Sequence, residues 1–152
     1  MYTKEFEGLF NMIGKAQKMA LATSSNNRVT ARTMSFIVEN KKLYFQTDIN
    51  FTKFHQIKDN PLVAVCWNNI QLEGSCKILG HPFEPQNLFF KQAFQKNYKS
   101  SYEKYSHLSN EVVVEIIPIL VTIWGYDNEK PYREFFDFKN RSYHKTYYNL
   151  SN

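Results

Sequence analysis

Three short extended runs between residues 19 and 48 constrain the fold of this chain most strongly. They read MALATSS, RVTARTMSFIVE and KLYFQTD, and they are rich in β-branched and aromatic residues. Asn26-Asn27 and Asn40-Lys41 separate them. Asn tolerates the positive φ that a two-residue hairpin turn requires. The segment therefore predicts three consecutive antiparallel strands.

Further strands are predicted downstream. LVAVCWN and IQLEGSCKILG give two more, EVVVEIIPILVTIWGY gives two extended runs interrupted at Pro118, and REFFDF gives a last short strand. Closing a sheet into a barrel leaves few unpaired edges. The six or seven short strands thus predict a mainly β fold with peripheral helices. The strands are expected to form an antiparallel barrel that is closed or nearly closed.

Two or three helices are expected around this barrel. An amphipathic helix opens the chain, with apolar residues at helical spacing: Phe6, Leu9, Phe10, Ile13 and Ala16. FTKFHQIKD predicts a short helix that stops before Asn60-Pro61. NLFFKQAFQKNY predicts a third helix, whose apolar stripe is Leu88, Phe89, Ala93 and Phe94. SSYEKYSHLSN is loop-like, and the tail NRSYHKTYYNLSN has no clear period.

The composition fits one globular domain over residues 1–152, with 43% hydrophobic and 22% charged residues. The net charge of +5 is spread over both halves of the chain, so no basic arm is indicated. Aromatic residues make up an unusual 16%. A small basic barrel rich in rings is compatible with single-stranded nucleic-acid binding, and this alternative stays open at this point.

Several classes of site lack their sequence signals. Phosphate-binding loops, dinucleotide fingerprints, nucleophile elbows and HExxH motifs are missing. Cys66 and Cys76 lack the spacing of a zinc site or disulfide framework, and we expect two buried reduced thiols and no metal. The N-terminal segment has charges within its apolar pattern, so a soluble cytoplasmic protein without a membrane partner is expected.

Charged and polar residues converge between Thr30 and Pro61. Strand alternation places Arg32 on one barrel face, and Thr52 and Lys53 open the short helix. A hydroxyl, an ammonium and the free N–H groups of a helix N-terminus are suited to binding a phosphate. The alternative is that Lys53 is solvated and Thr52 only caps the helix.

The same region resembles the pyridoxamine-phosphate-oxidase-like superfamily of FMN-binding split barrels. That family has a strand ending near a Thr, a K-x-x-x-I helix and an Asn-Pro, and this chain has Thr47, Lys53, Ile57 and Asn60-Pro61 in that order. TARTMSF is similar to the family's Arg-containing strand, and LEGSCKI to its next strand with Gly74. The similarity extends over roughly residues 19–79, with weaker agreement at PILVTIWG.

This resemblance implies FMN as the cofactor and a homodimer with FMN at the subunit interface. Arg32 and Lys53 would hold the phosphate with help from Thr52, while main-chain groups of residues 34–35 and 46–47 would border the flavin ring. Asn69 stands where relatives often have Gln, and Trp124 is similar to a tryptophan that reaches the partner's flavin. The implied cofactor-binding residues are Arg32, Thr33, Met34, Ser35, Gln46, Thr47, Thr52, Lys53, Asn69 and Trp124.

The chain departs from the oxidase proper after the tryptophan. The oxidase has an Arg-x-His element there, whereas Arg133 is followed by Glu134 and Phe135. Vitamin B6 phosphate is therefore not the expected substrate, and the chain is more similar to the nitroimidazole-resistance and general-stress branches. We expect an FMN-dependent oxidoreductase acting from a nicotinamide donor or small reductant on a small organic acceptor, such as a nitro compound or quinone. A carrier or sensor without turnover is the alternative, because no acid, base or nucleophile pair is evident near the site.

Overall fold

A computed structural model describes residues 1–149 as an eight-stranded antiparallel sheet with helices around it. The strands β1 to β8 follow the order β3-β2-β1-β4-β5-β6-β7-β8, and a further pairing of β3 with β6 closes the first six into a barrel. Their bounds are β1 Ala16–Ser25, β2 Arg28–Glu39, β3 Lys42–Asp48, β4 Leu62–Trp67, β5 Ile70–Gly80, β6 Glu111–Asp127, β7 Lys130–Asp137 and β8 Ser142–Tyr147. The predicted split β-barrel is confirmed.

The tight turns sit where the asparagines predict them. Asn26 and Asn27 have φ of 50° and 64°, and Asn40 and Lys41 have φ of 50° and 59°. Two successive positive φ values match the right-handed twist of the flanking strands, as in a type I′ hairpin. A third such turn at Asn128-Glu129 joins β6 to β7.

Strand β6 changes partners halfway along its length. Its first half pairs with β3 as far as Ile116, and its second half pairs with β7 from Leu120 onward. Pro118 and the bulged Ile119 lie between the two halves, where β6 faces Gly74 of β5. A proline has no N–H to give to a ladder, so a bulge accommodates it. The prediction of two separate runs is wrong here, because one 17-residue strand continues through Pro118.

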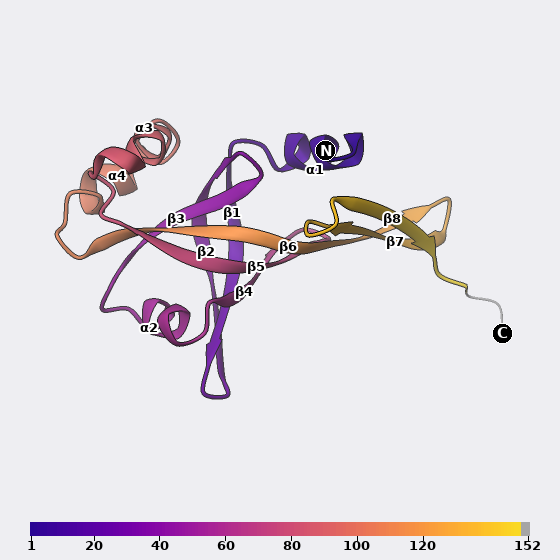
Figure 1. The fold of residues 1–152 in the computed structure, drawn as a ribbon, viewed down its shortest axis with the longest axis horizontal. Helices are drawn as coiled ribbons and strands as arrows, with labels where there is room; N and C mark the ends of the chain where they lie inside the picture. The colour runs from indigo at the N-terminus through magenta and orange to yellow at the C-terminus, as the bar shows by residue number, and fades with distance from the viewer. Residues whose placement is uncertain (150–152) are drawn as a thin grey trace.

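β7 and β8 form an extension beyond the barrel, which we call the wing (Figure 1). β8 lies within the tail that had no clear period, so that part of the prediction is wrong. Helix α1 (Lys4–Ile13) covers the barrel beside the wing, and Phe6 packs edge-on against Phe136 and Phe138. It ends at Gly14, whose φ is 82°, so Ala16 begins a strand instead of extending the helical face.

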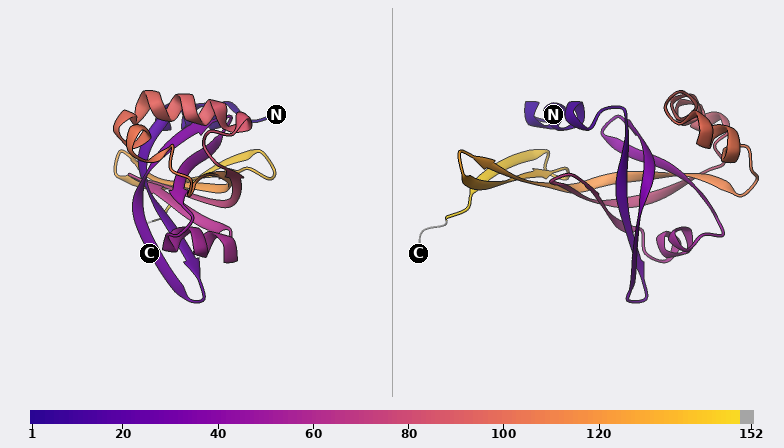
Figure 2. Two further views of the ribbon diagram at one scale, coloured as in Figure 1. Left: turned by 90° about the vertical axis from the view of Figure 1, so that its left-hand side faces the viewer. Right: turned by 180° about the vertical axis from the view of Figure 1, so that it is seen from behind.

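The remaining helices lie away from the wing, with α3 and α4 on one side of the barrel and α2 on the opposite side, as the views from the side and from behind show (Figure 2). They are α2 (Thr52–Asp59), the 3-10 turn η1 (Pro85–Asn87), α3 (Leu88–Asn97) and α4 (Lys99–Tyr105). α4 replaces the expected loop. α3 buries Phe90 and Phe94 against Ile37, Tyr44 and Val113. Leu88 is exposed, so its place in the predicted apolar stripe is wrong.

The two cysteines differ from each other in burial. Both are free thiols, but Cys66 is exposed and only Cys76 is largely enclosed. Burial raises the pKa of the Cys76 thiol to about 12. The prediction of two buried thiols is therefore wrong for Cys66, because Cys66 takes an exposed position in the alternating burial pattern of β4, next to the buried Val65. No helix within residues 1–149 is long and apolar enough to cross a membrane.

Candidate functional site

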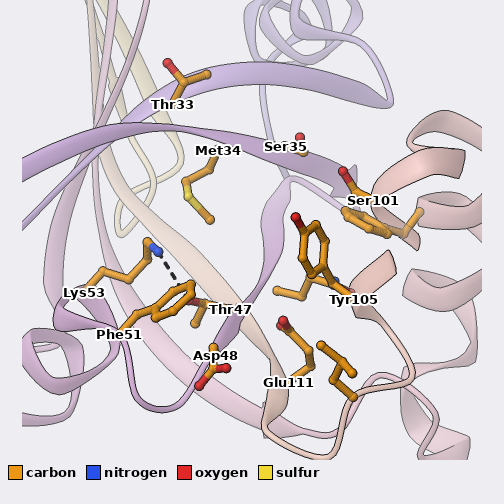
Figure 3. Close-up of a pocket in the computed structure, with 13 residues that line it drawn as sticks. Thr33, Met34, Ser35, Thr47, Asp48, Phe51, Lys53, Ser101, Tyr105 and Glu111 are labelled. Carbon is orange, nitrogen blue, oxygen red and sulfur yellow. Dashed lines mark hydrogen bonds between the residues drawn. The ribbon is translucent and has the colours of Figure 1, made fainter. Parts of the chain in front are cut away.

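A pocket of about 390 Å³ lies at the barrel end near α2 and α4. It is lined from β2 by Thr33, Met34 and Ser35, and from β3 by Gln46 and Thr47. Figure 3 shows Lys53 reaching in from α2 toward Thr47, with Tyr105 and Glu111 on the far side. Strands β2 and β3 and helix α2 thus place six of the predicted cofactor residues around one cavity, whereas Arg32 and Thr52 are not part of its lining.

Lys53 is half-buried at the edge of this pocket. Its Nζ donates to Thr47 Oγ1 at 3.4 Å and lies 4.7 Å from the centre of the Phe51 ring. Burial lowers the pKa of Lys53, and the positive charge of Arg32 lowers it further, while Glu111 and Asp48 act in the opposite direction. The surroundings of Lys53 therefore disfavour the charged form of its ammonium, which is typical of a group that binds a ligand.

Arg32 is fixed by the barrel itself. Its guanidinium donates to Thr23 Oγ1 at 2.9 Å, to the Leu21 carbonyl at 3.3 Å and to Thr30 Oγ1. The same two hydroxyls donate to Gln56 Oε1 of α2, at 2.6 Å from Thr23 and 2.7 Å from Thr30. This network ties α2 to β1 and β2, and burial lowers the pKa of Arg32. The position of α2 is thereby linked to the position of Arg32.

Neither cation has a carboxylate partner in the described part of the chain. The salt bridges there use Lys41, Lys42, Lys99 and Lys145 instead. Thr52 is the first residue of α2 and is exposed, and Phe51 holds the N-cap position without a side-chain capping bond. The alternative that Thr52 caps the helix is therefore wrong. Lys53, in the first turn of α2 with its free N–H groups, and the nearby Arg32 both lack an ion-pair partner in that part of the chain, and such a donor set suits an oxyanion such as a phosphate.

Asn69 and Trp124 lie outside this pocket. They contact each other: Asn69 Nδ2 donates to the Trp124 carbonyl, and the Trp124 N–H donates to the Asn69 carbonyl at 3.2 Å. The Trp124 side chain is 46% exposed and lies against Arg133 and Tyr148 of the wing. Within one chain, these two predicted residues are thus separate from the group around Lys53.

The far wall of the pocket consists of residues that the sequence pattern did not predict. Ser101 and Tyr105 come from α4, which looked like a loop, and Glu111 comes from the first position of β6. Glu111 is only 6% exposed. Burial, followed by the negative charge of Asp48, raises the pKa of Glu111 to about 7. An ionisable acid is therefore present at the site, contrary to expectation. The one sequence signal for this site residue was the position of Glu111 directly before the apolar run of β6.

This combination of a six-stranded split barrel and a cationic edge defines the class of protein. The family described as pyridoxamine 5'-phosphate oxidase matches residues 3–125. The chain belongs to this family of split barrels. No curated protein sequence matches it significantly.

Solved structures share the fold at low sequence identity. General Stress Protein 26 from Bacillus anthracis str. Sterne is 23% identical, with a TM-score of 0.63 over 78% of this chain and 92% of that one. A pyridoxamine 5'-phosphate oxidase-related, FMN binding protein from Nostoc punctiforme is 17% identical, with a TM-score of 0.62 over 87% and 86%. A nimc/nima family protein from Clostridium acetobutylicum is 16% identical, with a TM-score of 0.58 over 97% and 94%.

Proposed function

We propose that this chain is an FMN-binding flavoprotein and acts as an oxidoreductase. The observation that carries the proposal is Lys53 in the first turn of α2, with the charge of Arg32 near enough to lower its pKa and no carboxylate of residues 1–149 at ion-pair distance from either. A phosphate group fits this donor set because it can accept charge-assisted hydrogen bonds from both side chains and from backbone N–H groups. The Nostoc punctiforme protein, which is described as FMN binding, has the same fold.

The residues of the chain would hold and orient the cofactor in this proposal. Arg32 and Lys53 bind the phosphate, and Thr52 offers its hydroxyl from the exposed side of α2. Residues 33–35 and 46–47, on adjacent strands, border the flavin ring. When bound, FMN supplies two-electron transfer between a nicotinamide or other small reductant and a small organic acceptor such as a quinone or nitro compound. α4 forms one wall of the pocket with Ser101 and Tyr105.

We further propose that residues 1–152 form one FMN-binding unit and that two copies assemble. Apolar side chains on the outer barrel face support this assembly, since Val29 is 71% exposed, Leu62 57% and Ile119 45%. The three line one shallow surface pocket. An exposed apolar patch of this kind marks an interaction surface, and a two-fold partner would bring its own Trp124 to a second site. Light scattering at 18.1 kDa with FMN bound would contradict the homodimer.

The purified protein tests the proposed cofactor directly. We expect flavin absorption bands, or tight uptake of added FMN by cofactor-free protein. A colourless protein that takes up no FMN would reject the proposal. Turnover is then tested by oxidation of reduced nicotinamide with a panel of quinones and nitro compounds. A chain that binds FMN but oxidises no donor with any acceptor would be a carrier or sensor instead.

A further inference from the structure

Glu111 occupies an unusual position at the rim of the barrel. It is the first residue of β6 and pairs directly with Asp48 at the end of β3. Residues directly opposite on antiparallel strands project from the same face of the sheet, and like charges in such a pair repel each other. Both carboxyl groups line the pocket (Figure 3). Two acids are thus held together on the wall that faces Lys53.

The Glu111 carboxyl is also poorly solvated. Only 6% of the residue is exposed, and Oε2 has no hydrogen-bond partner among residues 1–149. A buried charge without partners is costly, so such a carboxyl keeps or acquires a proton when it can. Burial and the charge of Asp48 raise the pKa of Glu111 to about 7. Its protonation therefore changes near neutral pH.

Lys53 opposes this tendency from α2. Its charge lowers the pKa of Glu111, and the charges of Glu111 and Asp48 in turn favour the charged form of Lys53. Arg32 acts on Lys53 from the other side. Tyr105 of α4 is the remaining titratable group that faces the pocket from a packed element. Within residues 1–149, the pocket lining thus sets one cation, Lys53, against two acids, while Arg32 acts on Lys53 from outside the lining.

We propose that binding of a phosphate-bearing ligand at Lys53 and Arg32 drives the uptake of one proton by Glu111. The ligand's negative charge pairs with Lys53, so that Lys53 stabilises the ionised form of Glu111 less. The same negative charge also repels the ionised Glu111 carboxylate. Protonation of Glu111 removes one of the two adjacent acid charges and relieves both effects. The inference rests on the proposed function, since FMN is the phosphate-bearing ligand proposed there.

Proton uptake and affinity are linked. FMN affinity measured by fluorescence quenching should fall as pH rises from 7 to 8.5, approaching tenfold per pH unit while one proton is taken up. The phosphate of the ligand itself titrates near pH 6, below this window. Riboflavin lacks the phosphate, so its affinity should stay constant over the same window. Calorimetry in two buffers of different ionisation enthalpy should show net proton uptake with FMN and none with riboflavin.

Glu111→Gln tests the assignment because it keeps the shape of the side chain and removes its charge. This variant should bind FMN with a pH-independent affinity, about tenfold tighter than the wild type at pH 8.5. Its riboflavin affinity should be unchanged. Glu103→Gln, on the exposed side of α4, is the matched control and should behave like the wild type. Asp48→Asn should move the pH break to lower pH.

The outcomes separate this inference from the proposed function. No FMN binding at any pH rejects the proposed function. FMN binding with one affinity from pH 7 to 8.5, and no proton uptake by the wild-type protein, overturns the role of Glu111 alone and leaves the cofactor assignment standing. Retained coupling in Glu111→Gln together with its loss in Asp48→Asn would assign the proton to Asp48 and overturn the inference. The wild-type calorimetry decides even if a variant does not fold.

Discussion

Lys53 beside α2 and Lys145 in the wing are held in opposite ways. Lys145 lies 2.8 Å from an oxygen of Asp127, and this hydrogen bond is the main reason why the pKa of Lys145 is raised. Its ammonium also sits 4.0 Å from the centre of the Tyr132 ring. Lys53 has only a 3.4 Å hydrogen bond to a hydroxyl, and burial together with Arg32 lowers its pKa.

The difference shows which region needs a ligand. The wing satisfies its lysine with a carboxylate and rings of the same chain, so that lysine contributes to local structure. The barrel end leaves its cations without a carboxylate at ion-pair distance in residues 1–149, and Glu111 and Asp48 act on Lys53 only from farther away, so a bound anion would supply the close partner. Burying a charge without such a partner is unfavourable. Lys145 therefore stabilises the folded wing, whereas Lys53 lowers the stability of the ligand-free protein and serves to bind a ligand.

The largest expected effect concerns FMN affinity. Lys53→Ala should weaken FMN binding by about 1.5–3 kcal/mol, the size of a hydrogen bond to a charged group. Lys145→Ala is the matched control and should leave the affinity unchanged, since that lysine already has its partner in Asp127. Titration of cofactor-free protein with FMN measures both. Equal effects of the two substitutions would remove the distinction between the regions.

The two regions should also differ in their tolerance of added volume. A Cβ on Gly74 would lie 2.6 Å from Ile116 Cγ2 and 2.9 Å from the Ile117 carbonyl oxygen, and the backbone there cannot move easily. Gly74→Ala should lower the free energy of unfolding by about 1–3 kcal/mol. A Cβ on Gly125 meets the end of the Tyr132 side chain, which can rotate away.

Denaturant unfolding of the two variants compares barrel and wing. The loss in Gly125→Ala should be clearly smaller than in Gly74→Ala. A larger loss at Gly125 would mean that the wing is the more rigidly packed of the two regions. In that case, the contact of Tyr132 with Lys145 would stabilise the whole protein and not only the β7–β8 hairpin.

The sequence predicted the barrel better than the wing for a physical reason. Regular alternation and paired turn residues such as Asn26-Asn27 are local signals, and they located β1 to β5, the short helix α2 and, from REFFDF, strand β7 of the wing. β8 and α4 depend on tertiary packing. The ring of Tyr143 of β8 packs at a tilted angle against Phe136, and Tyr98, at the start of α4, donates to the Phe36 carbonyl at 2.9 Å. Neither contact leaves a period in the sequence.

The candidate site divides in the same way. The residues from strands β2 and β3 and from α2 were predicted because a motif places them in one stretch of sequence. Glu111 was missed because its neighbour Asp48 is 63 positions away and is brought close only by the closure of β3 against β6. Trp124 was predicted for the site, but a single chain places it at the wing, so its role at the flavin stays a prediction that needs the partner subunit.

Glu111 makes the stability of the ligand-free barrel depend on pH. Its pKa is about 7 in the folded protein and near 4.5 otherwise, so folding binds a proton between these values. The stability that this group contributes is present in full below about pH 4.5 and is lost as pH rises through about 7. Relative to Glu111→Gln, the wild type should lose on the order of 2 kcal/mol between pH 5 and 8. Urea unfolding of both proteins at the two pH values measures this difference, and a constant difference would contradict it.

The smallest expected effect belongs to the ion pair of the wing. Lys145 and Asp127 are both open to solvent, and Tyr147 also donates to Asp127. Exposed pairs contribute little, and salt screens them, since the Debye length is about 3 Å at 1 M salt. Lys145→Met keeps the apolar stem that packs on Tyr132, so it should lower the melting temperature only slightly, and this loss should vanish in concentrated salt. Thermal unfolding in low and high salt tests it. A loss that persists at high salt would show that the contact of the ammonium with the Tyr132 ring, and not its ion pair with Asp127, stabilises the wing. Lys145 would then resemble Lys53 in being a cation that is shielded from water.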